Sequence, residues 1–202
     1  MEQVIAYVDG FNLYHGIRER FGRRCHWLNL EALAASLLRQ GQTLVGVRYF
    51  TARVRDKPTS ELNQLTYLSA LTARTTILEI IEGRFQQRTV RCRSCGAEHR
   101  SHEEKESDVN LAVAMVHDAL VGRFDTALLI SADADHGPAV RTVRSAGKRV
   151  VAAFPPRRHS DALRRLADGA FTIGDAKIRQ AQLPAKVHRT NGPPLERPAY
   201  WA

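Results

Sequence analysis

Apolar residues occur along the chain in two alternating patterns. Short unbroken runs rich in β-branched residues, such as the one at 4–8, are typical of strands buried on both faces of a parallel sheet. Between these runs, apolar residues recur every three or four positions, which is the spacing of one helix face. The runs predict strands at 4–8, 44–51, 75–81, 126–130 and 150–154, and the helical spacing predicts helices at 30–38, 58–73, 107–122, 138–146 and 161–167.

Individual residues refine these helices. Asn29 is expected to cap the first, Gly41 to stop it, and Pro58 to lie in the first turn of the second. The helical spacing also predicts buried faces. These comprise Leu62, Leu65 and Leu68 in the helix at 58–73, and Val109, Ala112, Val113 and Val116 in the helix at 107–122.

The alternation of strands and helices predicts the fold class. Successive βαβ crossovers give an α/β domain with a mainly parallel sheet and helices on both faces. A chain of 202 residues has room for one such domain, which we expect to span residues 1–174. From Asp175 the composition shifts to Pro, Lys, Arg and Gln with little periodicity, so residues 175–202 are expected to form a flexible basic tail.

Residues 83–103 interrupt the alternation and are interpreted as an inserted hairpin or loop, because this polar, basic stretch has weak periodicity. It carries Cys92 and Cys95, followed by His99 and His102, and all four side chains can bind zinc. The gaps between them are shorter than in common zinc sites. A structural zinc ion, two reduced cysteines and a redox pair therefore all remain open.

The charge balance favours a polyanionic partner. Apolar residues make up 44% of the chain and charged residues 25%, which indicates a soluble globular protein rather than a disordered one. Thirty Lys and Arg against 21 Asp and Glu give a formal charge of +9, and binding to phosphates would release counterions. A basic surface that is merely solvated is the alternative.

The sequence also suggests a compartment. We find no apolar run of bilayer-spanning length, and the first ten residues lack a basic segment and a small-residue cleavage site. Three cysteines are an odd number and form no disulfide framework. A cytoplasmic protein is expected, with no membrane partner.

Acidic residues follow two of the predicted strands. Asp9 comes directly after the first strand, and Asp133 and Asp135 come after the strand at 126–130. The carboxyl ends of parallel strands form the edge where ligands bind in open α/β sheets. Asp108, in the first turn of its helix, reaches the same edge if that helix packs beside the first strand. Clustered carboxylates favour hard cations such as Mg²⁺ or Mn²⁺, which can activate water and neutralise a phosphodiester.

Each of these acids also has a purely local explanation. Asp9 with Gly10 can form a turn, and Asn12 can cap a helix. Asp135 can be an N-cap, and Asp108 can favour the dipole of its helix. Taken together, these local explanations do not explain why the acids share one edge of the sheet.

Three segments in this order resemble the NYN domain family: D-G-F-N at 9–12, E-K-E-S-D-V-N at 104–110 and L-L-I-S-A-D-A-D at 128–135. G-K-R-V-V at 147–151 is similar to the element that follows in that family, and the D-G-F-N-L-Y start resembles a bacterial subfamily. The resemblance covers about residues 5–174. It implies a PIN-like fold and RNA cleavage that depends on Mg²⁺ or Mn²⁺. It further implies metal binding by Asp9, Asp108, Asp133 and Asp135, and arrangement of the site by Asn12 and Ser131. Lys105 matches a family position often filled by a polar or charged residue, and either a phosphate contact or a merely solvated lysine fits it.

Two residues depart from the family pattern. Ala132 stands where Gly or Asn is usual, and His136 stands where an apolar residue is usual. His136 can reach the scissile phosphate or the leaving group, but the favoured interpretation is a histidine that merely begins a helix.

The function expected from these features is a metal-dependent ribonuclease acting on single-stranded RNA. A non-catalytic RNA-binding module is the first alternative. A second alternative is suggested by bacterial relatives with the same start that are described as 6-hydroxy-3-succinoylpyridine monooxygenases. The sequence has no G-x-G-x-x-G after the first strand and no G-x-x-x-x-G-K-[ST], which favours the hydrolase over a redox enzyme. Candidate RNA contacts are Arg53, Arg55, Arg157 and Arg158.

Overall fold

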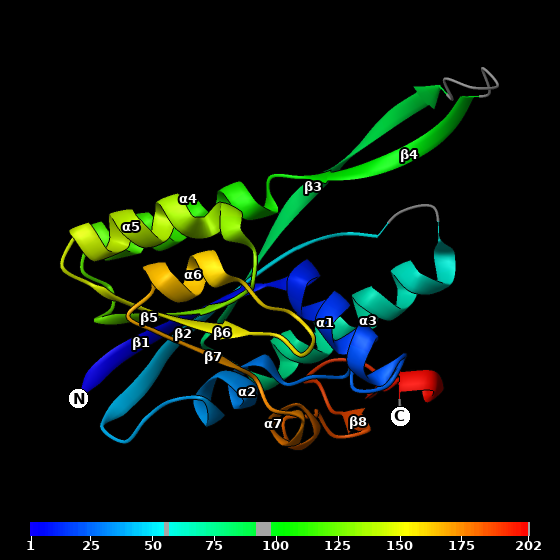
Figure 1. Ribbon diagram of the computed structural model, residues 1–202. Helices are drawn as coiled ribbons and strands as arrows, with labels where there is room; N and C mark the ends of the chain where they lie inside the picture. The colour runs from blue at the N-terminus through cyan, green and yellow to red at the C-terminus, as the bar shows by residue number, and fades with distance from the viewer. Residues whose placement is uncertain (55–56, 92–97, 202) are drawn as a thin grey trace.

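A computed structural model describes residues 1–54, 57–91 and 98–201 of the chain. Its centre is a seven-stranded sheet in the order β4-β3-β2-β1-β5-β6-β7, in which six strands are parallel and β4 is antiparallel to β3 (Figure 1). The strands are β1 (Glu2–Asp9), β2 (Gln42–Ala52), β3 (Leu78–Arg91), β4 (Glu98–Lys105), β5 (Thr126–Ile130), β6 (Arg149–Phe154) and β7 (Gly169–Thr172).

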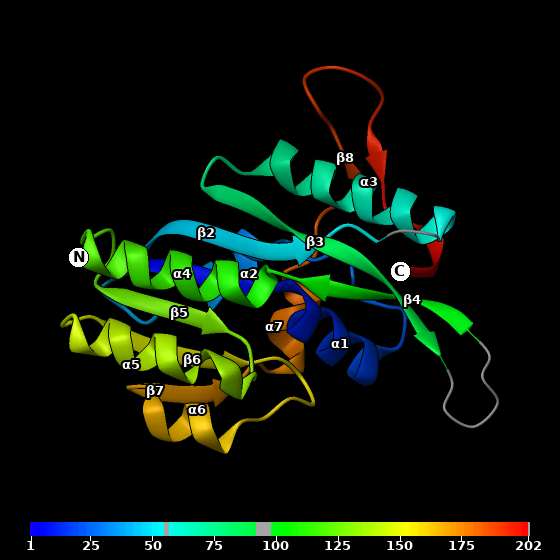
Figure 2. The same cartoon turned by 90° about the horizontal axis from the view of Figure 1, so that it is seen from above.

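Helices cover both faces of the sheet, as Figures 1 and 2 show. One layer consists of α4 (Ser107–Leu120), α5 (Gly137–Ser145) and α6 (Asp161–Leu166), and the other of α1 (Gly10–Phe21), α2 (Leu30–Ser36), α3 (Pro58–Arg74) and α7 (Asp175–Gln180). Successive side chains of a strand point to opposite faces, so β1 supplies two cores. Val4, Ala6 and Val8 pack in the core under α1, whereas Ile5 and Tyr7 pack in the core under α4. The predicted α/β fold is confirmed.

The predicted insertion is a two-stranded arm. β3 continues well past the predicted strand end, and β4 returns antiparallel to it, so the pair projects from the body of the molecule (Figures 1 and 2). His99 and His102 lie on β4. Cys92 and Cys95 lie outside the described residues.

Helix α1 and strand β7 were not predicted. α1 buries Leu13, Ile17 and Phe21, but the positions between them are mostly polar and include Gly16. A Cβ at Gly16 would lie 2.7 Å from the carbonyl oxygen of Pro156, so this glycine is required by close packing against the loop after β6. A helix with three buried apolar positions and an internal glycine gives only a weak periodic signal.

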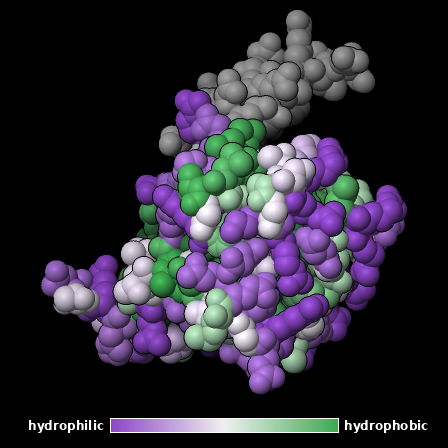
Figure 3. Space-filling view, turned by 90° about the vertical axis from the view of Figure 1, so that its left-hand side faces the viewer, coloured by the Kyte–Doolittle hydropathy of each residue, from purple (hydrophilic) through white to green (hydrophobic). Residues whose placement is uncertain are grey.

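The buried face predicted for α4 was wrong at two of its four residues, because Ala112 and Val116 pack against the core but Val109 and Val113 do not. Leu111 and Met115 are fully buried, whereas Val109 and Val113 are 63% and 62% exposed. Residues 111–116 of this helix form an unbroken apolar run, so spacing alone could not identify the inner face. Figure 3 shows hydrophobic side chains gathered at the top of the molecule, over α4. Leu62 of α3, also predicted to point inward, is 65% exposed.

Residues 175–201 pack against the domain, in contrast to the flexible tail that was expected. They form α7, a small hairpin of β8 (Lys186–Val187) and β9 (Leu195–Glu196), and η2 (Ala199–Trp201). Ile178, Leu183 and Val187 are buried, and Trp27 donates a hydrogen bond from Nε1 to the carbonyl of Pro184 at 2.8 Å. These apolar residues dock singly without a helical or strand period, which is why composition suggested disorder.

Within the described part of the chain, no helix combines the length and apolar character that crossing a bilayer requires.

Candidate metal centre

Asp9 lies where β1 ends and α1 begins, and both of its carboxylate oxygens are engaged. Oδ1 accepts the backbone N–H of Asn12 at 3.0 Å as the N-cap of α1, and Oδ2 accepts the hydroxyl of Ser131 at 2.8 Å. Helix α1 can start here because Gly10 has no Cβ, which would lie 2.5 Å from the carbonyl oxygen of Phe50. The carboxylate is therefore buried and held in one orientation.

The loop that follows β5 is folded by a chain of hydrogen bonds. Asn12 accepts the backbone N–H of Ala132 on its Oδ1 at 3.0 Å, and Ser131 Oγ accepts that of Asp133 at 3.0 Å. Asp133 in turn caps η1 (Ala134–His136), accepting the N–H of Asp135 at 2.9 Å. Asn12 and Ser131 thus join the end of β1 to this loop.

His136 is the residue that this loop brings against Asp9. It precedes α5, as expected for a histidine that begins a helix, but its ring is 99% buried rather than solvated, with Nε2 3.6 Å from Asp9 Oδ2. Nε2 has no hydrogen-bond partner within normal distance among the described residues. Burial alone would lower the pKa of this imidazole, but the carboxylates of Asp9, Asp108 and Asp133 together outweigh burial and raise it, with Asp9 contributing most.

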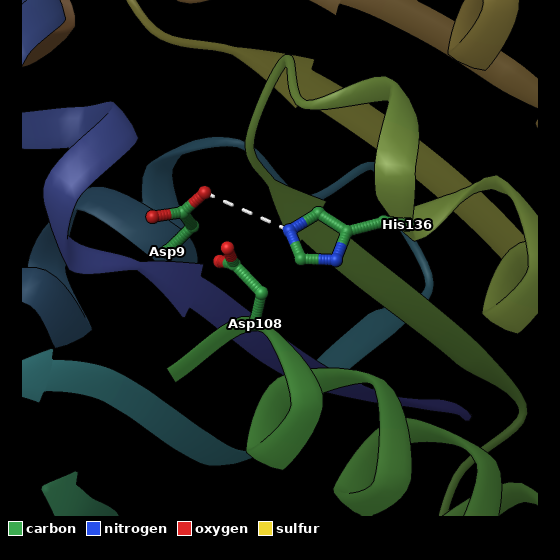
Figure 4. A group of neighbouring side chains, drawn as sticks. All are labelled: Asp9, Asp108 and His136. Atoms are coloured by element: carbon green, nitrogen blue, oxygen red, sulfur yellow. Dashed lines mark ion pairs between the residues drawn. The ribbon is translucent and has the colours of Figure 1, made fainter. Parts of the chain in front are cut away.

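Asp108 completes a group of three. It lies in the first turn of α4, which packs beside β1 as the expectation for this residue required. Ligand atoms of Asp9, Asp108 and His136 all lie within 4.8 Å of one another, and Figure 4 shows the three side chains pointing together. Glu106, which precedes α4, has a left-handed backbone with φ of 83° and forms an ion pair with Arg84 on β3, so the start of the helix is anchored to the sheet.

The four acids expected from the sequence are only partly brought together. Asp9 and Asp108 belong to the three-residue group, whereas Asp133 and Asp135 do not. Asp133 is half-buried and close enough to influence His136, and Asp135 is exposed. Lys105 is the last residue of β4, paired with Arg84. Sequence reasoning missed His136 as a member of the group, although its place after an acidic loop was the available signal.

The group fits a divalent cation. Two carboxylates concentrate negative charge that a cation would neutralise. The buried Nε2 of His136, which has no hydrogen-bond partner among the described residues, is aimed at the same space. Carboxylates suit Mg²⁺ and Mn²⁺, while an imidazole is a better ligand for transition metals. The donor set is therefore mixed, and not the oxygen-only set that the sequence suggested.

The arginines predicted to contact RNA differ in their surroundings. Arg53 forms a two-pronged pair with Glu82, at 2.6 and 3.0 Å, and Arg158 pairs with Glu19. Arg157 is exposed in the loop after β6, at the same edge of the sheet as Asp9. Arg55 lies outside the described residues.

Comparison with known proteins gives three findings. The family model described as NYN domain matches residues 3–174. A 6-hydroxy-3-succinoylpyridine 3-monooxygenase, HspA, from Pseudomonas putida is 27% identical over an alignment that covers 69% of this chain. This chain spans 54% of the length of that relative. A crystal structure of a protein of unknown function, VPA0982, from Vibrio parahaemolyticus has the same fold, with a TM-score of 0.60 and 20% identity over 86% of this chain and 94% of that one.

Proposed function

Because the chain belongs to the NYN domain family, whose PIN-like domains are generally nucleases, we propose that it is a metal-dependent ribonuclease. The observation that carries the proposal is the convergence of Asp9, Asp108 and His136 at the carboxyl edge of the sheet. Carboxylates gathered at a strand edge suit the binding of the cations that assist phosphodiester hydrolysis.

Each residue of the site has a proposed task. Asp9, Asp108 and His136 would hold a Mg²⁺ or Mn²⁺ ion, which when bound activates water and neutralises charge on the phosphodiester. Asn12 and Ser131 fix the orientation of the Asp9 carboxylate. Asp133 and Asp135 add negative charge from the loop side, consistent with the acidic set that the family resemblance implies.

The proposed substrate is single-stranded RNA. The formal charge of +9 favours a polyanion, and Arg157 is an exposed cation at the same edge as the acids. Lys105 precedes the helix that carries Asp108 and is the second proposed phosphate contact. Binding held by such contacts should weaken steeply as salt is raised.

Asp108→Asn is the sharpest test of the proposal. Asp108 is exposed, so the amide should leave the melting temperature nearly unchanged while removing one charged ligand. Asp125→Asn, which makes the same chemical change at the opposite end of β5, is the matched control. We expect RNA cleavage in Mn²⁺ to be lost in the first variant, retained in the second and abolished by EDTA in the wild type. Normal cleavage by Asp108→Asn, or by wild type in EDTA, would overturn the proposal.

Assays on the same purified protein also test two other functions. A non-catalytic RNA-binding module would bind RNA in a metal-independent way and never cleave it. The name of the Pseudomonas putida relative favours hydroxylation of a heteroaromatic acid as a second candidate enzyme activity. Oxygen uptake with 6-hydroxy-3-succinoylpyridine, and a visible absorption band from a bound cofactor, would support that candidate over the hydrolase.

We also propose that Cys92, Cys95, His99 and His102 hold a structural zinc ion, with reduced thiols as the alternative. Elemental analysis of the purified protein decides between them. One zinc per chain that disappears in the Cys92→Ser, Cys95→Ser double variant supports the site, and a zinc-free wild type removes it.

A further inference from the structure

A cavity of 520 Å³ lies beside the candidate metal centre, on the face of the sheet covered by α1 and α3. Its walls come from α1, the end of β2, the start of α3 and the segment that ends in η2. Gly10, which directly follows Asp9, is part of the wall. A molecule in this cavity would therefore lie close to Asp9.

Aromatic rings with accessible faces line the cavity. Tyr14 is 39% exposed and Tyr200 43% exposed, although both belong to a wall of the cavity. Trp201 is half-buried and meets Tyr200 edge-on, with ring centroids 6.2 Å apart and planes at 84°. His26 lies against Tyr14, with centroids 4.7 Å apart. Such rings are platforms on which another flat ring can stack.

The charges around the cavity are of one sign. Arg18, Arg23 and Lys57 line it, and no Asp or Glu does so among the described residues. The guanidinium of Arg23 lies 5.7 Å from the centre of the Tyr200 ring, so a cation and an aromatic face are offered together. The cavity thus favours a ligand that is both flat and anionic.

The walls are held in place by hydrogen bonds within the protein. Gln64 donates to the carbonyl of Ala52 at 2.9 Å and accepts the backbone N–H of Val54 at 2.7 Å, which fixes the chain where it leaves β2. Asn63 donates to the hydroxyl of Tyr200, which attaches the C-terminal segment to α3. Because the wall is already ordered, little conformational entropy is lost when a ligand binds.

We propose that this cavity binds a nucleobase and its attached phosphate, namely the base of a nucleotide next to the bond that is cleaved. This inference rests on the proposed ribonuclease function. A base stacked among Tyr14, Tyr200 and Trp201 would place its own backbone phosphates toward Gly10 and the acids, while Arg23 or Lys57 neutralises one of them. A free heteroaromatic acid shares this chemistry of a flat ring with an anionic group, so the test separates the two sources.

The test uses the fluorescence of Trp201 in EDTA, where no metal-dependent cleavage occurs. The chain has two tryptophans, and Trp27 is fully buried. Adenosine and uridine 5′-monophosphates are titrated in turn, with inorganic phosphate and 6-hydroxy-3-succinoylpyridine as comparison ligands. We expect saturable quenching by at least one nucleotide, no quenching by phosphate at the same concentration, and loss of the signal in Trp201→Phe.

Variants then locate the binding. Tyr14→Ala and Arg23→Ala should each weaken nucleotide binding roughly tenfold, because stacking and a charged contact are lost. Tyr14→Phe, which keeps the ring, should restore affinity, and Arg165→Ala on the exposed side of α6 should have no effect.

Absence of quenching by both nucleotides, or tighter binding of the pyridine acid than of either one, would overturn the inference. Nucleotide binding without any RNA cleavage would support the cavity as a nucleotide site and contradict the ribonuclease proposal. RNA cleavage without nucleotide binding would support the ribonuclease proposal and contradict the cavity as a nucleotide site.

Discussion

Ser131 donates its hydroxyl hydrogen to Asp9 at 2.8 Å and so joins the ends of β5 and β1, which are 122 positions apart in the sequence. The other oxygen of Asp9 is held by the first turn of α1. The carboxylate therefore has its orientation before any ion binds. Partners of this kind, one step removed from a metal, commonly govern how tightly the metal is held.

Ser131→Ala should weaken Mn²⁺ binding by about ten- to a hundred-fold, because it frees the Asp9 carboxylate and leaves the N–H of Asp133 without its acceptor. Isothermal titration with Mn²⁺ measures the affinity directly. Ser160→Ala is the matched control, since Ser160 Oγ accepts the backbone N–H of Leu163 as the cap of α6 and has no hydrogen bond to the acids among the described residues. It should lose about 0.5–2 kcal/mol of stability and keep its metal affinity. Equal Mn²⁺ affinity in Ser131→Ala and wild type would show that this hydrogen bond does not organise the site.

The sequence predicted the parts of the site that depend on strand ends. β1 and β5 are short buried runs, and parallel strands bring the residues that follow them to one edge. That reasoning correctly placed Asp9 beside the loop that begins with Ser131. It also required α4 to pack next to β1 for Asp108, which the structure bears out.

Other features depend on tertiary contacts that no local pattern records. Asn12 and Ser131 accept backbone hydrogen bonds that turn the loop so that His136 faces inward. The spacing of residues in the sequence does not predict these bonds. The buried face of α4 was ambiguous because Val109 and Val113 are as apolar as Leu111. In each case the neighbouring element decides which side chain is buried.

Asp133→Ala and Asp133→Asn should differ in stability in EDTA. Asp133 caps η1 through Oδ1, and asparagine caps as well as aspartate, so only the alanine should lose about 0.5–2 kcal/mol. The asparagine should equal or slightly exceed wild type, because it keeps the cap and removes one of several clustered negative charges. Urea unfolding of the three proteins compares the free energies. If both variants lose the same free energy, the charge of Asp133 has a structural partner of its own.

Asp118→Ala should be the most damaging change among the polar residues of the α4 core. Its carboxylate is 99% buried, accepts the hydroxyl of Tyr7 at 2.8 Å and pairs with Arg48 at 2.6 Å. Removing it takes the buried carboxylate away from a largely buried guanidinium and leaves the more exposed Glu79 as its ion-pair partner among the described residues, so we expect a loss of about 3–5 kcal/mol. Tyr7→Phe removes one hydrogen bond to a charged group and should lose less, about 1.5–3 kcal/mol. Thermal or urea unfolding checks the order, and a milder effect of Asp118→Ala than of Tyr7→Phe would contradict it.

The contribution of His26 to the free energy of unfolding should fall in mildly acidic solution, because this residue binds a proton more readily in the unfolded chain. Burial lowers the pKa of this imidazole, so the unfolded chain takes up a proton at a higher pH than the folded one. The contribution of His26 is then complete above the unfolded value of about 6.5 and is lost as pH falls from there toward the folded pKa. His26→Gln removes this dependence, so wild type should lose more free energy of unfolding than the variant between pH 7 and pH 5. The difference between the two profiles isolates His26 from His136, whose raised pKa acts in the opposite direction. Parallel profiles would mean that His26 ionises equally in both states.

Mn²⁺ should stabilise the protein more than Mg²⁺ at the same concentration, and His136→Asn should reduce this difference. An ion that binds only the folded state raises stability by mass action, by about 2.7 kcal/mol at a hundred times its Kd. The imidazole of His136 adds a nitrogen ligand that Mn²⁺ accepts more readily than Mg²⁺, which prefers oxygen. Asparagine replaces that nitrogen with an amide oxygen, so the gain with Mn²⁺ should shrink while the smaller gain with Mg²⁺ changes little. Melting curves in EDTA, Mg²⁺ and Mn²⁺ measure both gains, and Asp108→Asn serves as the comparison because it should lower the two together. If His136→Asn kept the full preference for Mn²⁺, its ring would not be a ligand, and the metal would be held by the carboxylates alone.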